Sequence, residues 1–191
     1  MEKQRAEMNE TMNEFLERIE KLEGQESTNT FAVATSAPSV SPNLSPPPGF
    51  TEQDIVRYDG RIFIPLASRK VRKASAIAKC QRAGGKLANI YNQNHMDKIM
   101  AFIRDNKLDG VSYKDFHLGM TFDPLNQILR FRDGTVTSHM GFKWLLGTPT
   151  NRQGYYSTFT NMVIKIQNDS TSPYQYIYNY PDRKEYVICE I

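Results

Sequence analysis

The side chains best suited to chemistry in this sequence are three histidines and two cysteines. His95, His117 and His139 form no His-x-x-x-His pair or other short spacing typical of metal ligands. Cys80 as a nucleophile would need a neighbouring base, and the sequence contains no Gly-x-Ser-x-Gly elbow, P-loop or dinucleotide-binding fingerprint. We therefore expect a non-enzymatic protein in which His95 and His117 are structural.

Cys80 and Cys189 allow two interpretations. They are either two unrelated buried thiols or one disulfide, which would close a loop of about 110 residues. Spacing alone does not decide between these alternatives. Three Asn-x-Ser/Thr sequons, at Asn9, Asn43 and Asn168, fit an extracellular chain, where disulfides persist.

A tyrosine-rich stretch near the C-terminus is a candidate for ligand binding. Tyr174, Tyr176, Tyr178 and Tyr180 alternate with other residues, so one face of a strand could display all four. Tyrosines supply large, rigid contact areas and are enriched in binding surfaces. The alternative is that half or more of the aromatic side chains in this region pack in the interior.

The same region carries little negative charge. Residues 141–181 contain one acidic residue, Asp169, and three basic ones. Ca²⁺ takes six to eight oxygen ligands, usually including several carboxylates, so this composition argues against a calcium site. The mild basicity of residues 51–191, with thirteen acidic and twenty basic residues, gives no argument for a nucleic-acid partner.

The densest charge cluster is the basic run of residues 69–73, Arg-Lys-Val-Arg-Lys. It falls at the expected start of a helix, where cations oppose the helix dipole. One interpretation is a solvated face. The other is a patch that binds anionic glycans or lipid headgroups.

Residues 55–191 contain the elements that would position these side chains. Apolar periodicity and Gly-rich stop signals predict two helices, followed mainly by short strands, which is typical of an α+β domain. The helices are expected at residues 71–83 and 93–106, and the strands at 61–64, 87–90, 116–122, 129–132, 162–166 and 185–191.

Two segments precede this domain. Residues 1–24 show heptad spacing of apolar residues, which predicts a coiled-coil neck that forms a parallel homo-oligomer, with a trimer as the expected form. A single amphipathic helix docked on its own domain is the alternative. Residues 25–54 are expected to be a disordered Pro/Ser-rich linker. We expect no transmembrane segment, and no signal peptide is visible in this sequence.

Five sequence elements, in order, resemble the C-type lectin-like domain family. They are Cys-Gln-Arg-Ala-Gly-Gly-Lys-Leu-Ala at 80–88, Phe-His-Leu-Gly-Met at 116–120, Phe-Arg-Asp-Gly-Thr at 131–135, Lys-Trp-Leu-Leu-Gly-Thr-Pro at 143–149 and Tyr-Val-Ile-Cys-Glu at 186–190. The neck and the Ala-Gly-Gly context most resemble collectins, particularly surfactant protein A. No collagen repeat precedes the neck in this sequence.

The resemblance implies a fold with two helices, short antiparallel sheets and a long loop, and it implies that Cys80 and Cys189 form the family's long-range disulfide. The family's Glu-Pro-Asn calcium motif is represented by Thr148-Pro149-Thr150, and its Trp-Asn-Asp motif is best matched by Tyr178-Asn179-Tyr180. Only Asn179 keeps a calcium-ligand type. Pro149 is often cis in the family.

We therefore expect a non-enzymatic, extracellular recognition protein that binds a glycan, lipid or protein ligand without the usual calcium. The alternative is a calcium-dependent carbohydrate-binding lectin, for which Asn179 is the remaining metal-ligand candidate. The candidate ligand-binding residues are Thr148, Pro149, Thr150, Asn151, Arg152, Tyr176, Tyr178 and Asn179.

Overall fold

The computed structural model describes residues 45–150 and 157–191. The predicted coiled-coil neck at 1–24, and the linker as far as residue 44, lie outside the described residues. In the described parts, no helix is long and apolar enough to cross a membrane. In chain order the elements are η1 (Glu52–Asp54), β1 (Val56–Tyr58), β2 (Arg61–Val71), α2 (Lys73–Arg82), β3 (Lys86–Leu87), α3 (Gln93–Asn106), β4 (Tyr113–Asp123), β5 (Ile128–Arg130), β6 (Val136–Thr137), η2 (His139–Gly141), β7 (Asn161–Gln167), β8 (Tyr176–Tyr180) and β9 (Glu185–Glu190).

Helix α3 occupies the predicted residues 93–106. The side chain of Asn92 caps its N-terminus by accepting a hydrogen bond from the backbone N–H of His95 at 2.9 Å. Met96, Ile99, Met100 and Ile103 are buried, as their helical spacing predicts. Both the start and the buried face of α3 are therefore set by local sequence.

Helix α2 is shorter than the predicted 71–83. Its N-terminus has no cap from its own segment; instead, the Oδ1 atom of Asp182 accepts a hydrogen bond from the backbone N–H of Lys73 at 3.2 Å. A carboxylate at this position offsets the unfavourable basic residues around the helix start. The helix ends just before Gly84, whose φ of +80° favours glycine.

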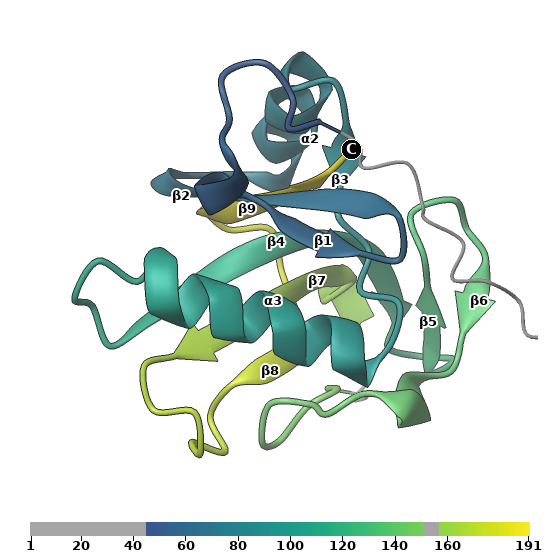
Figure 1. Ribbon diagram of the computed structural model, residues 1–191. Helices are drawn as coiled ribbons and strands as arrows, with labels where there is room; N and C mark the ends of the chain where they lie inside the picture. Colours follow the sequence, from purple (N-terminus) through teal and green to yellow (C-terminus); the bar gives the residue numbers. More distant parts are fainter. Residues whose placement is uncertain (1–44, 151–156) are drawn as a thin grey trace, which may run out of the picture. The chain divides into compact units, whose positions relative to one another are not determined.

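One sheet joins the strands in the order β1-β2-β9-β4-β5-β6, with β3 paired to β9 and β7 lying between β4 and β8 (Figure 1). All pairs are antiparallel except β4 with β9, which run parallel. This pair corrects the expectation of purely antiparallel sheets. Strand β2 extends well beyond the predicted 61–64, and the short strands β1 and β6 were not predicted.

The two helices cover separate hydrophobic clusters. Phe63 and Ile188 belong to the cluster that includes the buried face of α3, whereas their strand neighbours Ile62 and Cys189 belong to the cluster beneath α2. This alternation follows the period of two along a strand. The central strands β2 and β9 therefore contribute side chains to both cores.

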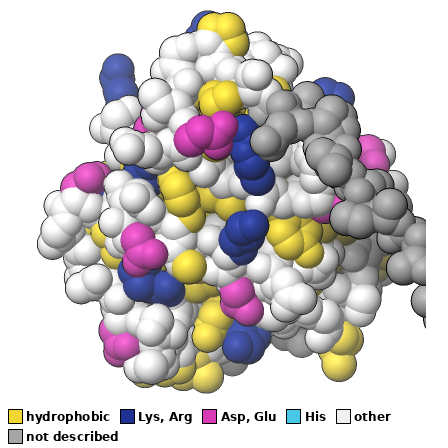
Figure 2. Space-filling model, in the orientation of Figure 1, with side chains coloured by type: hydrophobic (Ala, Val, Ile, Leu, Met, Phe, Trp, Pro, Cys, Tyr) yellow, Lys and Arg dark blue, Asp and Glu magenta, His cyan; other side chains and the backbone are white. Residues whose placement is uncertain are grey.

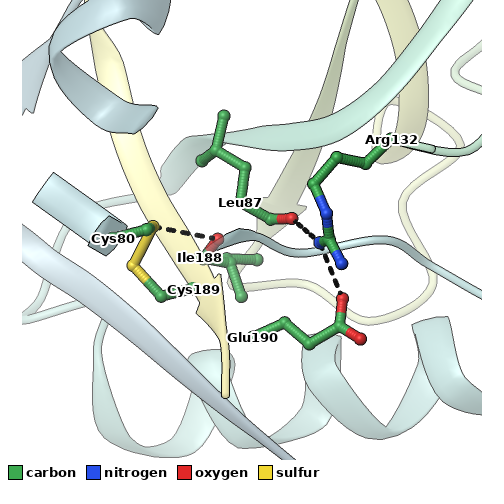
Figure 3. Close-up of a disulfide and its surroundings, with 6 residues drawn as sticks. All are labelled: Cys80, Leu87, Arg132, Ile188, Cys189 and Glu190. Carbon is green, nitrogen blue, oxygen red and sulfur yellow. Dashed lines mark hydrogen bonds and ion pairs between the residues drawn. A yellow bond between two sulfur atoms is a disulfide. The ribbon is translucent and has the colours of Figure 1, made fainter. Parts of the chain in front are cut away.

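The disulfide joins helix α2 to the last strand, β9. Cys80 and Cys189 are fully buried and lie 5.2 Å apart at their Cα atoms (Figure 3). The pairing implied by the family resemblance is confirmed. The two interior histidines were also predicted correctly: His95 is fully buried, and Nε2 of His117 lies 2.8 Å from the carbonyl oxygen of Val71.

Candidate functional site

One buried side chain, that of Asn179 in β8, fastens the long loop between η2 and β7. Its Oδ1 accepts a hydrogen bond from the backbone N–H of Thr150 at 2.8 Å. Its Nδ2 donates to the backbone carbonyls of Thr150 at 3.2 Å and Phe159 at 3.0 Å. Asn179 is 1% exposed. Asn179 therefore bonds to both described ends of the loop, at Thr150 and at Phe159. We call these three hydrogen bonds the loop clamp.

The remaining loop candidates are used internally or lie outside the described residues. The Thr148–Pro149 peptide bond is cis, as the family resemblance implied. The hydroxyl of Thr148 donates a hydrogen bond to the carbonyl of Leu145 at 2.7 Å. Asn151 and Arg152 fall in the segment 151–156, which the structure does not describe.

The loop clamp has a direct consequence for metal binding. The Oδ1 atom of Asn179, which is the carbonyl oxygen an amide ligand would offer to calcium, is already hydrogen-bonded to a backbone N–H. Within residues 45–150 and 157–191, no group of three or more His, Cys, Asp or Glu side chains is placed to hold a metal ion. The described part of the loop thus fits a closed, hydrogen-bonded loop better than a calcium cradle.

The structure corrects the prediction that one strand face displays four tyrosines. Tyr178 is 4% exposed; its hydroxyl donates to Oδ1 of Asp115 at 2.9 Å and accepts from Nη2 of Arg183 at 2.7 Å. Burial, with the nearby Asp115 charge as a second cause, raises the pKa of Tyr178 well above its usual range. The side chain of Tyr178 is therefore interior and offers no face to a ligand.

Tyr176 has a different environment, at the edge of a pocket. Its backbone φ of +89° lies in the left-handed region, which is rare for a bulky side chain and is typical of functional or strained positions. The Nζ atom of Lys143 lies 5.6 Å from the centre of its ring. The pocket has a volume of about 220 Å³, and we call it the Tyr176 pocket; it is lined by Asp97, Met100, Arg104, Lys143, Ser170, Gln175 and Tyr176.

Hydrogen bonds fix the polar floor of the Tyr176 pocket. Arg104 donates through Nη2 to Oε1 of Gln175 at 3.1 Å and through Nε to the carbonyl of Gln167 at 3.0 Å. Nε2 of Gln175 in turn donates to the carbonyl of Ser170 at 2.6 Å. These bonds hold the side chains in place before any ligand arrives, which lowers the entropic cost of binding.

A second set of hydrogen bonds orients the pocket rim. The side chain of Gln93 donates to Oδ1 of Asp97 at 2.7 Å and accepts from the backbone N–H of Lys143 at 2.8 Å. The pocket therefore offers a carboxylate, an ammonium group and an aromatic ring together. Such a combination suits a small polar ligand with several hydroxyl groups.

Sequence reasoning identified Tyr176 but missed the rest of this pocket. The available signal was the spacing of Asp97, Met100 and Arg104, which are three and four residues apart and so share one face of α3. The partners of that face, Lys143 and Gln175, come from distant segments. Nothing in the local sequence relates these segments to α3.

Comparison with known proteins gives one family match. A family model described as the lectin C-type domain matches residues 69–191. The match includes both helices, the disulfide and the long loop. None of the curated proteins compared with the chain matches it.

Solved structures with a similar fold include a lectin and antifreeze proteins. The C-type lectin domain of murine dendritic cell inhibitory receptor 2, solved with an N-glycan, is 19% identical with a TM-score of 0.55, and the alignment covers 74% of this chain and 98% of that chain. A calcium-independent type II antifreeze protein is 17% identical with a TM-score of 0.50, over 74% of this chain and 94% of that chain. A Ca²⁺-dependent type II antifreeze protein, in its Ca²⁺-free form, is 16% identical with a TM-score of 0.52, over 72% of this chain and 97% of that chain. These likenesses show a shared fold.

Proposed function

This chain belongs to the C-type lectin domain family, and we propose that it is a non-enzymatic recognition protein that binds a glycan without calcium in its long loop. The observation that carries the proposal is the Tyr176 pocket. Its aromatic ring can pack against the C–H face of a sugar, while Lys143 and Asp97 can bind hydroxyl groups. The experiments below test glycan binding against the alternatives of a lipid or a protein ligand.

Two observations support recognition without calcium. The loop clamp uses the one amide oxygen that matches a calcium-ligand position, and residues 141–181 carry a single carboxylate side chain, that of Asp169. The Asp169 carboxylate is itself engaged: its Oδ1 accepts hydrogen bonds from the backbone and hydroxyl of Thr171. The fold also occurs in a protein named as calcium-independent.

Assembly and location are further parts of the proposal. The heptad pattern of residues 1–24 favours a homo-oligomer, most simply a trimer, and the Pro/Ser-rich linker would let several domains reach separate ligands. Weak single sites would then gain avidity. The disulfide and the sequons favour an extracellular location. The Ala-Gly-Gly motif favours the collectin branch of the family, an assignment that rests on sequence alone.

A glycan array, probed with the full chain in calcium and in chelator, tests the proposed ligand class. We expect the same glycans to bind under both conditions. Loss of all binding in chelator would instead favour the calcium-dependent lectin. Binding confined to lipid vesicles or proteins, with no glycan retained, would overturn the glycan assignment.

Matched variants test the site. Tyr176→Ala removes the ring from the pocket, and we expect it to weaken binding of the array-selected glycan about ten-fold, as loss of one aromatic contact implies. Tyr174→Ala is the control, because Tyr174 is 57% exposed and does not line the pocket. If the two substitutions weaken binding equally, and both variants unfold at the wild-type temperature, the Tyr176 pocket is not the glycan-binding site.

A further inference from the structure

A second pocket lies on a different part of the domain, between α2, β3, β4 and the turn after β5. Its volume is about 220 Å³, and it shares no residue with the Tyr176 pocket. We call it the basic pocket. Besides the backbone of Gly119, it is lined by Lys73, Ile77, Gln81, Lys86, Leu87 and Arg132.

The charges that line the basic pocket are all positive. Three of its lining residues, Lys73, Lys86 and Arg132, are basic, and none is acidic. By contrast, basic and acidic side chains are interspersed on the molecular face that carries α3 (Figure 2). A concave surface lined by one sign of charge concentrates ligands of the opposite sign.

Lys73 is the member of the sequence's basic run that reaches this pocket. Two other basic members of the run are paired with acids: Nζ of Lys70 lies 3.3 Å from Glu185, and Nη1 of Arg72 lies 3.3 Å from Asp182. The ammonium of Lys73 instead donates to the backbone carbonyl of Met120 at 3.1 Å. Burial lowers the pKa of Lys73 to about 8, so its ammonium group is mostly charged near neutral pH. An ammonium group has three N–H donors, and the bond to Met120 uses one of them.

The carboxylates of Glu190 and Asp182 bond to residues that line the basic pocket as well as to other groups. Glu190 pairs with Nη1 of the lining residue Arg132 at 3.0 Å (Figure 3). The other carboxylate oxygen of Glu190 accepts a hydrogen bond from the hydroxyl of Tyr91 at 2.5 Å. Arg61 also approaches Glu190, at 3.5 Å. Asp182 likewise has two partners: it forms an ion pair with Arg72 and accepts a hydrogen bond from the backbone N–H of Lys73. These acids offset only part of the positive charge.

The pocket also has an apolar side. Ile77 is 43% exposed although it lies on a helix that covers a hydrophobic cluster, and the buried Leu87 also lines the pocket. The aliphatic stems of the two lysines add further apolar surface. A free inorganic anion would leave this surface unused, whereas a ring with an attached anionic group would use both parts.

We propose that the basic pocket binds one anionic sugar residue, a ring that carries a sulfate or carboxylate group. The anionic group contacts Lys73 and Lys86, and the C–H face of the ring packs on Ile77. The volume of about 220 Å³ is sufficient for a single ring. This site is separate from the glycan site proposed at Tyr176 and from the loop clamp.

The probe is N-acetylglucosamine 6-sulfate, titrated into the full chain by calorimetry, with N-acetylglucosamine and inorganic sulfate as comparison ligands. We expect the sulfated sugar to bind more tightly than either comparison ligand. Lys86→Ala should weaken it about ten-fold, the effect of losing one charge-assisted hydrogen bond. Ile77→Glu, which places a negative charge at an exposed position in the pocket, should abolish binding.

Lys98→Ala is the matched control, because Lys98 is an exposed lysine on α3 outside the pocket. Equal weakening by Lys86→Ala and Lys98→Ala, or inorganic sulfate binding as tightly as the sulfated sugar, would overturn the inference. Tyr176→Ala distinguishes the two proposals. If it abolishes binding of the sulfated sugar, the basic pocket is not the site, whereas retained binding supports a site independent of Tyr176.

Discussion

Replacing Asn179 by aspartate separates two possible roles of this residue. Asn179→Asp keeps an oxygen for the backbone N–H of Thr150 but replaces the Nδ2 group, which donates to two carbonyl oxygens at 3.2 and 3.0 Å. If Asn179 serves as a calcium ligand, a carboxylate should serve equally well or better. If it serves as the loop clamp, the same change should destabilise the domain.

The size of the expected effect follows from the hydrogen bonds. Two hydrogen bonds are lost, one of them buried and the other partly buried, and each loss leaves a carbonyl oxygen facing a second oxygen at a side chain that is 1% exposed. Leaving buried polar groups unpaired costs roughly 1–3 kcal/mol each, so we expect a loss of about 3 kcal/mol in the free energy of unfolding. For a domain of this size that corresponds to a melting temperature lower by roughly 10 °C.

Thermal unfolding of the wild type and of Asn179→Asp, each in calcium and in chelator, gives the answer. Asn168→Asp is the control, because it makes the same chemical change at an exposed residue. We expect only Asn179→Asp to unfold early, and calcium to change neither melting temperature. The reasoning is refuted if Asn179→Asp melts with the wild type, or if calcium raises the melting temperature of either protein.

Three further predictions concern the scaffold. Replacing both Cys80 and Cys189 by serine opens a loop with a sequence separation of 109 and should lower the free energy of unfolding in urea by about 4–5 kcal/mol in the chain-entropy model; an unchanged value would contradict this. Gly119→Ala would place its Cβ 2.5 Å from a backbone carbonyl oxygen of β3, so it should lower the free energy of unfolding by about 1–3 kcal/mol or more. Gly141→Ala is the control and should leave the free energy of unfolding unchanged, because nothing lies within 4 Å of the added atom. Burial lowers the pKa of His95 from 6.5 to about 4; because the folded-state pKa is the lower one, stability present above pH 6.5 should decline by about 3 kcal/mol as the pH falls toward 4. Urea unfolding across this range should show a smaller decline for His95→Gln, and an identical decline would count against the assignment.

Features set by local sequence were predictable from the residues alone. Helix α3 was placed correctly because its cap residue and apolar spacing lie within one segment. Helix α2 was placed less well because Asp182, which accepts the first backbone N–H, comes from a distant turn. The disulfide needed the family resemblance, since two cysteines separated by 109 positions give no local signal.

The candidate site was predictable only in part, for a physical reason. Alternating tyrosines indicate a strand, but they do not say which face is covered. The folded structure shows that Tyr178 is interior, where its hydroxyl contacts Asp115 and Arg183. The Tyr176 pocket depends on side chains from α3, the long loop and the turn before β8, which only the folded chain brings together.

The most direct test of calcium-free glycan recognition is an NMR titration of the tightest-binding array glycan into the chain in the presence of chelator. We predict saturable shifts centred on Lys143, Gln175 and Tyr176, with the same affinity after calcium is added. Shifts that occur only with calcium and centre on Thr150 and Asn179 would contradict the account.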